Sequence, residues 1–199
     1  MRTRTALEMW GKRLAAASVM TAALAGAGCS PDSATANKAN VYLIVTEVET
    51  QAGGGETGAF LMSDVSIPVF NDNATVKLRN SAKNPLVSND GHYQDVALER
   101  YTVRYYRTDG RNTEGVDVPY AFQGPLAGTV EAEGETDAVF VLVRQQAKLE
   151  PPLSQLSKDG GGILITCFAE VNIFGHTLTG EVVSARATVS VTFADFPDN

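Results

Sequence analysis

A period of two that keeps every second residue apolar between positions 163 and 193 constrains the fold more than any other feature of this sequence. Alternation with a period of two places every second side chain on the same face of a β-strand. The pattern runs twice, on either side of a glycine-bearing segment at Gly175–Gly180. The sequence therefore predicts a long antiparallel hairpin with one buried face and a turn at Gly175–Gly180. The apolar positions are Ile163, Ile165, Cys167, Ala169, Val171 and Ile173, then Val183, Ala185, Ala187, Val189, Val191 and Phe193.

Shorter runs with strand character precede this hairpin, and none has a helical period. Turn-forming residues such as Gly53–Gly55 separate them, and Pro151-Pro152 predicts an extended, non-helical passage. Counted together, the runs indicate about eight short strands, the pattern of an all-β antiparallel sandwich. We expect it to form one domain over residues 41–199. The shorter runs lie at residues 41–46, 60–69, 75–79, 101–106 and 139–144.

The first 28 residues have the pattern of a secretory signal peptide. An apolar stretch of about 7–15 residues is typical of a signal peptide, whereas a membrane-spanning helix needs about 20. Residues 14–27 carry no charge and fit the shorter class. We therefore expect residues 1–28 to be removed. The basic residues that precede the uncharged stretch are Arg2, Arg4, Lys12 and Arg13.

The end of this leader resembles the lipobox of bacterial lipoproteins, in which small residues precede a cysteine that becomes lipidated. The segment is Leu24-Ala25-Gly26-Ala27-Gly28-Cys29, and it departs from the family at Gly26, where Leu, Val or Ala is usual. The resemblance implies a lipid on Cys29 and, through Ser30, an outer-membrane address if the cell is Gram-negative. Two alternatives stay open. The leader is either an ordinary signal peptide cut near Ala27, which frees Cys29 to pair with Cys167, or it is never cleaved.

The mature chain is acidic, and this excludes two classes of partner. The whole sequence has 16 basic and 23 acidic residues, and the leader holds four of the basic and one of the acidic residues. The remainder carries 12 basic and 22 acidic side chains, a net charge near −10. Nucleic acids and anionic lipid surfaces both bind basic patches. We therefore expect no nucleic-acid partner, and attachment to the membrane only through Cys29 and a flexible tether at residues 29–40.

One strand and its turn resemble a known fold. Residues 101–110, Tyr-Thr-Val-Arg-Tyr-Tyr-Arg-Thr-Asp-Gly, look like the central strand and turn of fibronectin type III and other immunoglobulin-like domains. Residues 101–196 also resemble uncharacterised bacterial lipoproteins that carry such a sandwich, most distinctively at 109–120 and 144–152. The resemblance implies an immunoglobulin-like β-sandwich, and the family supplies no functional residues. The chain lacks the buried tryptophan and the paired cysteines of antibody-type domains.

No catalytic pattern stands out. A nucleophile elbow, Gly-x-Ser-x-Gly, is absent, and Gly53–Gly58 lacks the Lys-Ser/Thr pair of a P-loop. His92 and His176 lie in predicted turns, without the neighbouring ligands that a zinc site needs. Cys167 shares the apolar face of the predicted hairpin, so we interpret it as a buried thiol. We expect no enzyme and no cofactor.

Calcium is the strongest metal alternative. Oxygen-bearing residues gather in predicted loops at Asn71–Asn73, at Asn89-Asp90, and at Asp109, Glu114 and Asp117. None of these groups has the ordered spacing of a calcium-binding loop, and Asn and Asp favour turns for backbone reasons. We interpret them as turn residues and keep a calcium-stabilised adhesion domain as an alternative.

Tyrosines cluster between residues 101 and 120. Tyr101 and Tyr105 share one face of a strand and Tyr106 takes the other, so at least one side is expected in the core. A carbohydrate-binding or hydrolase-accessory module, a second alternative, needs acidic and aromatic side chains in one cleft. The candidates for such a cleft are Asp109, Glu114, Asp117 and Tyr120.

The function that we expect is a non-catalytic binding or structural module of the bacterial envelope. It would engage another envelope protein through its loops or through a sheet edge. The expectation comes from the lack of a catalytic pattern on a type of scaffold that commonly serves recognition.

Overall fold

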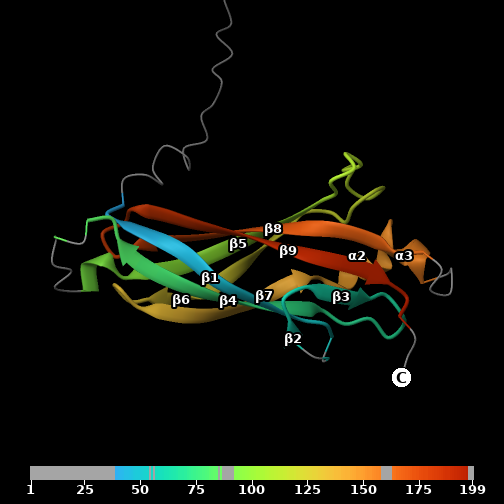
Figure 1. The fold of residues 1–199 in the computed structure, drawn as a ribbon, viewed down its shortest axis with the longest axis horizontal. Coiled ribbons are helices and arrows are strands. Elements are labelled where there is room, and N and C mark those ends of the chain that lie inside the picture. Colours follow the sequence, from blue (N-terminus) through green and yellow to red (C-terminus); the bar gives the residue numbers. More distant parts are fainter. Residues whose placement is uncertain are drawn as a thin grey trace, which may run out of the picture.

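The computed structural model describes residues 39–53, 55, 57–84, 86, 92–157 and 163–196. Within them, strands dominate and the helices are short, which confirms the all-β prediction (Figure 1). The predicted signal peptide, Cys29 and most of the predicted tether lie outside the described residues.

One sheet has four strands in the order β2-β1-β4-β7, and all of its pairs are antiparallel. On β4 the side chains of Ala74, Val76 and Leu78 are buried at alternate positions. This is the pattern of a strand that turns one face to the core and the other to water. The strands are β1 (Val41–Gln51), β2 (Thr57–Gly58), β4 (Asp72–Ala82) and β7 (Glu135–Val143).

The second sheet has five strands in the order β3-β9-β8-β5-β6. β3 runs parallel to β9, so the prediction of a wholly antiparallel sandwich is wrong at this edge. A tight hairpin forces antiparallel pairing, but β3 enters this sheet from β2 in the other sheet and has no hairpin with β9. The strands are β3 (Leu61–Asp64), β5 (Val96–Tyr106), β6 (Phe122–Val130), β8 (Ile165–Thr177) and β9 (Val182–Ala194).

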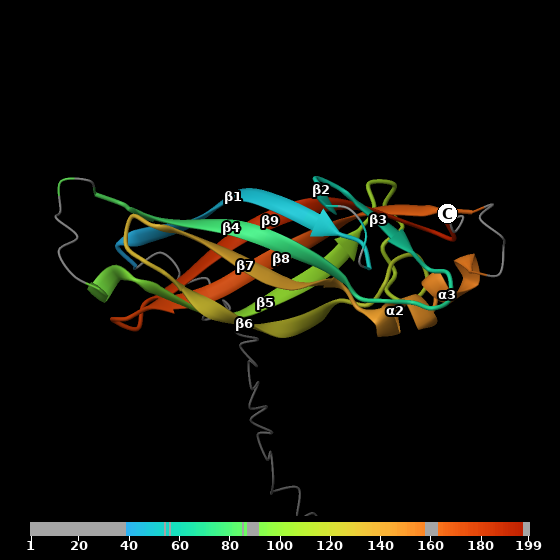
Figure 2. The ribbon, with the colours of Figure 1, turned by 90° about the horizontal axis from the view of Figure 1, so that it is seen from below.

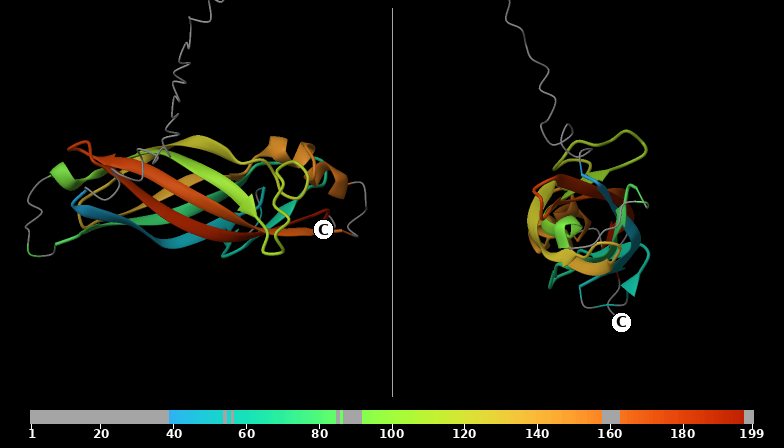
Figure 3. Two further views of the ribbon diagram at one scale, coloured as in Figure 1. Left: turned by 90° about the horizontal axis from the view of Figure 1, so that it is seen from above. Right: turned by 90° about the vertical axis from the view of Figure 1, so that its left-hand side faces the viewer.

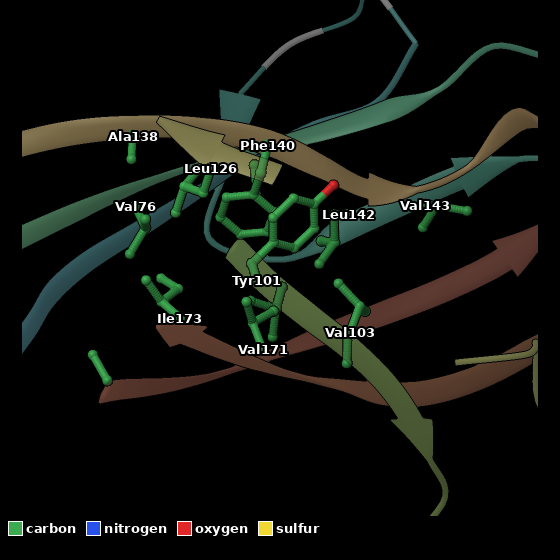
Figure 4. Packing of buried hydrophobic residues seen from close by; sticks show 14 of the residues in the cluster. Val76, Tyr101, Val103, Leu126, Ala138, Phe140, Leu142, Val143, Val171 and Ile173 are labelled. Atoms are coloured by element: carbon green, nitrogen blue, oxygen red, sulfur yellow. The ribbon is translucent and has the colours of Figure 1, made fainter. Parts of the chain in front are cut away.

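The two sheets face each other, as the end-on view of Figure 3 shows, and the buried side chains between them form one hydrophobic core. Near its centre Tyr101 packs against Phe140, with their ring centroids 4.8 Å apart (Figure 4). Val76 from β4, Leu126 from β6 and Ile173 from β8 surround these rings. Burial of each such apolar side chain contributes about 1.5–3 kcal/mol, so the contact between the sheets is the main source of stability.

The long hairpin predicted from the alternation is present as β8 and β9, paired along their whole length. Its turn lies after Thr177, however, so the predicted start of the turn at Gly175 is wrong. Gly175 lies within β8, where a Cβ atom would come 2.5 Å from the carbonyl oxygen of Ala97 on β5. The glycine is needed for close approach of two strands and not for a turn. His176 therefore lies in a strand, and its prediction as a turn residue is wrong as well.

Two further elements differ from the sequence prediction. The pattern does not predict β6, because Gly124, Pro125 and Gly128 interrupt it, yet an edge strand such as β6 tolerates these residues. The passage around Pro151-Pro152 is not extended but joins two short helices, α2 (Gln145–Leu149) and α3 (Leu153–Leu156). Pro152 is the N-cap residue of α3, a place where the fixed φ of proline does no harm.

The molecule is elongated, and its two ends carry different elements (Figure 2). The helices α2 and α3 lie at the end where β3 pairs with β9. The opposite end carries the one-turn 3-10 helix η1 (His92–Gln94) and the β8–β9 turn, joined by a hydrogen bond from Leu178 N–H to the carbonyl of Asp95. No helix in the described ranges is long and apolar enough to cross a bilayer.

Candidate functional site

The four residues predicted as a binding cleft lie in the loop between β5 and β6. The Arg107 guanidinium donates to Asp109 over 2.5–3.1 Å, and Arg111 Nε donates to Asp117 over 3.1 Å. The hydrogen bond from Arg107 is the chief reason why the pKa of Asp109 lies below its ordinary value. Burial acts to raise the pKa of Asp117, but hydrogen bonds from Thr113 and Arg111 outweigh it and lower that pKa too. Both carboxylates are thus engaged within their own loop.

The other two residues of the predicted cleft also serve the loop. Glu114 forms a backbone bridge with Val118. The Tyr120 hydroxyl packs so closely over Gly115 that a Cβ atom there would lie 2.2 Å from it, and Gly115 has a positive φ of 73°. A ligand-binding role for Asp109, Glu114, Asp117 and Tyr120 stays a prediction.

The tyrosines of β5 divide between core and surface as the alternation predicts. Tyr101 and Tyr105 are 4% and 2% exposed. The Tyr105 hydroxyl donates to the carbonyl of Leu142 over 2.6 Å, and burial raises the pKa of Tyr105 well above its ordinary value. Tyr106 lies on the other face of β5 and stacks on Phe168 with a centroid distance of 5.6 Å.

Cys167 is buried, which confirms its interpretation as a core residue. Burial disfavours the thiolate and raises the pKa of Cys167 to about 12. A thiol of this kind stays protonated at neutral pH and is a poor nucleophile.

The histidines and those calcium candidates that the structure describes do not assemble into a metal site. His92 lies in η1 with an exposed side chain whose Nδ1 is 2.9 Å from a carboxylate oxygen of Asp95. Within the described residues no three His, Cys, Asp or Glu side chains form a group that would hold a metal. Asn89 and Asp90 lie outside the described residues. Asp72 and Asn73 lie in β4, so their interpretation as turn residues is wrong.

A buried ion pair closes the end of the sandwich that carries α2. The side chains of Asp72 and Lys148 are 0% and 2% exposed, and Lys148 Nζ lies 2.9 Å from Asp72 Oδ1. The backbone N–H of Gly53 donates to the same oxygen over 2.9 Å, and the Ser63 hydroxyl donates to Oδ2 over 2.6 Å. Both oxygens are therefore hydrogen-bonded, as a carboxylate removed from water requires.

Local sequence explains how these groups come together. Asp72 is in phase with the buried alternate positions of β4, so its side chain must enter the interior. Lys148 is reached directly from β7 through the single turn of α2. Gly53 can bring its N–H to the carboxylate because it has no side chain, since a Cβ atom there would lie 2.8 Å from the Cβ of Phe70.

An open hollow of about 280 Å³ lies beside this ion pair. Asp72, Lys148, Asp64, Ser66 and Phe70 are among the residues that line it. The side chain of Phe70 is 55% exposed. We call this feature the Lys148 hollow.

The Asp64 side chain, which lines the Lys148 hollow, is a charged carboxylate held by hydrogen bonds. Asp64 Oδ1 accepts from the backbone N–H groups of Ser66 and Phe196 over 2.9 and 3.3 Å, and Oδ2 accepts from the Ser66 hydroxyl over 2.5 Å. Burial by itself would raise the pKa of Asp64. The hydrogen bonds and the nearby charge of Lys148 outweigh this effect and hold the pKa below its ordinary value.

Lys148 has more hydrogen-bond donors than partners among the described residues. An ammonium group has three N–H donors and no acceptor. Among the described residues it uses one of them, in its contact with Asp72. Unused donors on a buried charge cost free energy. Because Lys148 lines the hollow, a group inside the hollow can meet this need.

β3 borders the same end and is an edge strand, with β9 as its one neighbour in the described sheet. A hydrogen bond of 3.0 Å from Val65 N–H to the carbonyl of Ala194 sets the phase of this parallel ladder. Residues 61, 63 and 65 turn their backbone polar groups toward β9, so Met62 and Asp64 turn theirs outward. An edge of this kind offers N–H and C=O groups to an incoming strand.

Apolar surface surrounds the open part of this strand. Phe60 and Met62 are 61% and 50% exposed, and a hollow of about 290 Å³ separates them from β2. The Thr50 hydroxyl donates to the carbonyl of Phe60 over 2.8 Å, so the outward carbonyl of Phe60 already has a partner and the next outward residue is Met62. We define the β3 edge as Phe60, Met62 and the outward backbone groups of Met62 and Asp64.

Sequence reasoning did not bring Asp64, Asp72 and Lys148 together. Asp72 and Lys148 are separated by 76 positions, and no local spacing links them. One feature of the sequence pointed to the site. Asp72 occupies an inward-facing position of its strand, and a buried carboxylate requires a partner of opposite charge.

Comparisons with known proteins give no family for this chain. No protein-family model matches it, and no curated protein matches it. Two solved structures are similar to it in part. A structural genomics target solved by X-ray is 11% identical, with a TM-score of 0.37 over 78% of this chain and 86% of that chain. A solution structure assigned provisionally to the late embryogenesis abundant (LEA) proteins is also 11% identical, with a TM-score of 0.42 over 80% of this chain and 74% of that chain. Because both TM-scores lie below 0.5, we infer nothing from either likeness.

Proposed function

We propose that this protein is a non-catalytic, lipid-anchored module of the bacterial envelope that binds another envelope protein through the β3 edge. The observation that carries the proposal is the outward-facing backbone of Met62 between the exposed side chains of Phe60 and Met62. An added strand would gain main-chain hydrogen bonds there and would bury both apolar side chains.

The state of the reactive groups supports a non-catalytic role. The Cys167 thiol is buried and protonated, and the Ser63 hydroxyl is buried and donates to Asp72. A nucleophile needs an adjacent base and access to substrate. Neither group has that access.

The proposed anchor rests on the lipobox-like segment that ends at Cys29, and the outer-membrane address rests on Ser30 in a Gram-negative cell. One acyl chain binds a membrane only marginally, whereas several chains hold a protein stably. The acidic surface of the mature chain supports attachment through lipid, because it would repel anionic headgroups.

We propose further that the sandwich is immunoglobulin-like. The support is the order of its strands. β1, β4 and β7 in one sheet, against β9, β8, β5 and β6 in the other, correspond to strands A, B and E against G, F, C and C′ of that fold. In the same scheme β3 corresponds to a short first-strand extension that pairs with the last strand.

Substitution of one backbone donor tests the binding proposal. Met62→Pro removes the outward N–H of Met62 but no hydrogen bond to β9, because residues 61, 63 and 65 make those bonds. Met62→Val keeps the N–H and serves as the matched control. In pull-downs from native membranes we expect wild type and Met62→Val to recover the same partner and Met62→Pro to lose it. Equal recovery by Met62→Pro, or no partner with any of the three, would overturn the proposal.

The anchor has its own test. We expect the wild-type protein, made with its own leader, to enter the detergent phase with a lipid-sized increase in mass, and Cys29→Ser to lose both properties. A soluble, unmodified wild-type protein cut near Ala27 would show that Cys29 is not lipidated.

A further inference from the structure

We propose that the Lys148 hollow is a binding site for a neutral carbohydrate. This site is separate from the β3 edge and does not depend on the protein-binding function proposed above. The proposal rests on three features of the hollow: hydrogen-bonding groups that have capacity for further partners, the exposed ring of Phe70, and its size.

The hydrogen-bonding groups call for a ligand that both accepts and donates. Lys148 lines the hollow and uses one of its three N–H donors on a described residue, and Asp64 lines the hollow with a charged carboxylate. Three hydrogen bonds to Asp64 leave room for one more on Oδ2, since a carboxylate has about four acceptor positions. A hydroxyl group can accept from an ammonium and donate to a carboxylate at the same time.

The charge of the hollow selects against ionic ligands. Its described lining holds two carboxylates and one ammonium, so the net charge of these groups is negative and an anion is repelled. A ligand cation would pair with Asp64, but it carries no acceptor for the donors of Lys148. A neutral polyhydroxyl compound satisfies both groups, and adjacent hydroxyls on a sugar ring lie close enough to reach both.

The side chain of Phe70 adds an apolar contact. Phe70 is exposed and lines the hollow, as does Pro68. The carbon-bound hydrogens on one face of a sugar ring can pack against an aromatic ring while the hydroxyls point to polar groups. With Phe70 beside Asp64 and Lys148, the hollow can contact both the apolar face and the hydroxyl groups of a sugar.

The size of the hollow limits what it holds. Its volume of about 280 Å³ lies just below the lower limit of about 300 Å³ for ordinary small-molecule pockets, and it is open. We infer that it holds one sugar unit, and that the remaining units of a longer glycan would extend out of the open hollow.

Titration of the whole mature protein with N-acetylglucosamine and with glucose tests the proposal, with acetate and ethanolamine as the anionic and cationic comparisons. In an amide-resolved NMR spectrum we expect a sugar to shift the signals of Gly53, Ser66 and Phe196, whose N–H groups donate to the carboxylates of the hollow. The binding should be weak and saturable. No saturable shift with either sugar, or equal shifts with acetate or ethanolamine, would overturn the proposal.

Two variants separate the site from general effects on the surface. Phe70→Ala should weaken sugar binding about three- to tenfold, because an aromatic contact contributes about 0.5–1.5 kcal/mol. Phe60→Ala removes an aromatic ring of similar exposure that does not line the hollow, and it should leave sugar affinity unchanged. Ser66→Ala, which frees a position on Asp64 without touching the ion pair, gives a second variant in case Phe70→Ala disturbs the fold. Equal losses for Phe70→Ala and Phe60→Ala would contradict the site.

Discussion

Each end of the sandwich holds a buried carboxylate, and the two are stabilised in different ways. At the end with α2, Asp72 meets the buried ammonium of Lys148. At the end with η1, Asp95 accepts from the backbone N–H of Ala132 over 2.8 Å and contacts the exposed ring of His92. The first carboxylate depends on an opposite charge in the interior, whereas the second depends on the backbone and on a group at the surface.

The hydrogen-bonding groups left over at the two ends have opposite character. At the η1 end, side-chain oxygens of Asn80 and Gln94 are buried without a partner among the described residues, so acceptors are in excess. At the α2 end Lys148 has more donors than partners among the described residues, and this residue lines an open hollow. Trapped water can meet an acceptor inside a closed end, but a donor beside a hollow is also open to a ligand. This difference separates a structural closure from a candidate site.

The largest expected effect comes from removing the buried cation. Lys148→Met should lower the free energy of unfolding by about 3–5 kcal/mol, because it leaves Asp72 buried without an opposite charge. The matched control is Lys77→Met, which removes an exposed pair with Glu47 at 2.7 Å and should leave the free energy of unfolding nearly unchanged. Chemical denaturation measures both. Equal losses would mean that the α2 end does not depend on its ion pair.

Removing the carboxylate at the other end should cost less. Asp95→Ala leaves the Ala132 N–H without its acceptor, at a cost of about 1–3 kcal/mol in the free energy of unfolding. The same denaturation experiment compares it with Lys148→Met. If Asp95→Ala lowered the free energy of unfolding more than Lys148→Met does, the η1 end would be the more dependent on its carboxylate, contrary to our expectation.

The acid limb of stability should depend on Asp64. Its pKa in the folded state lies below the ordinary value of 3.8, so Asp64 stabilises the fold above that pH. This contribution is lost as the pH falls through the lowered pKa. Asp64→Asn should therefore lose less stability than wild type on acidification below about pH 4. Denaturation curves recorded from pH 7 to pH 2 give the comparison, and parallel decline of the two proteins would contradict it.

The smallest effect is expected at the surface of the η1 end. His92→Ala should change the free energy of unfolding by no more than about 0.5 kcal/mol, because the ring is exposed and Asp95 keeps its bond from Ala132. Thermal or chemical unfolding is sufficient to measure it. A cost above about 1 kcal/mol would show that Asp95 also depends on the exposed ring.

Much of the fold was predictable from alternation alone. The β8–β9 hairpin and the core position of Tyr101 and Cys167 follow from a period of two, because one face of each strand must be buried. The errors lie at glycines and prolines. Gly175 was assigned to a turn although it serves a close contact between strands, and Pro125 hid an edge strand that tolerates it.

The candidate site was far less predictable than the fold. Asp72 was interpreted as a loop residue, and Lys148 belonged to a segment without a predicted role. Their pairing depends on the position of α2 after β7. An alternation within one strand cannot predict that position. The parallel pairing of β3 with β9 is a second long-range feature of this kind, and it determines which backbone groups of Met62 face outward.

The direction of β1 has a consequence for orientation at the membrane. β1 begins at Val41, opposite Ala82 at the η1 end, and finishes at Gln51, opposite Asn73 near the Lys148 hollow. With about 3.4 Å for each of its 11 residues, the strand covers about 37 Å. With the lipid on Cys29, as we propose, the chain enters the domain at the end remote from the hollow. The hollow and the β3 edge would then lie about the length of β1 from that point, so a partner bound there would have this length of strand between it and the anchored end of the domain.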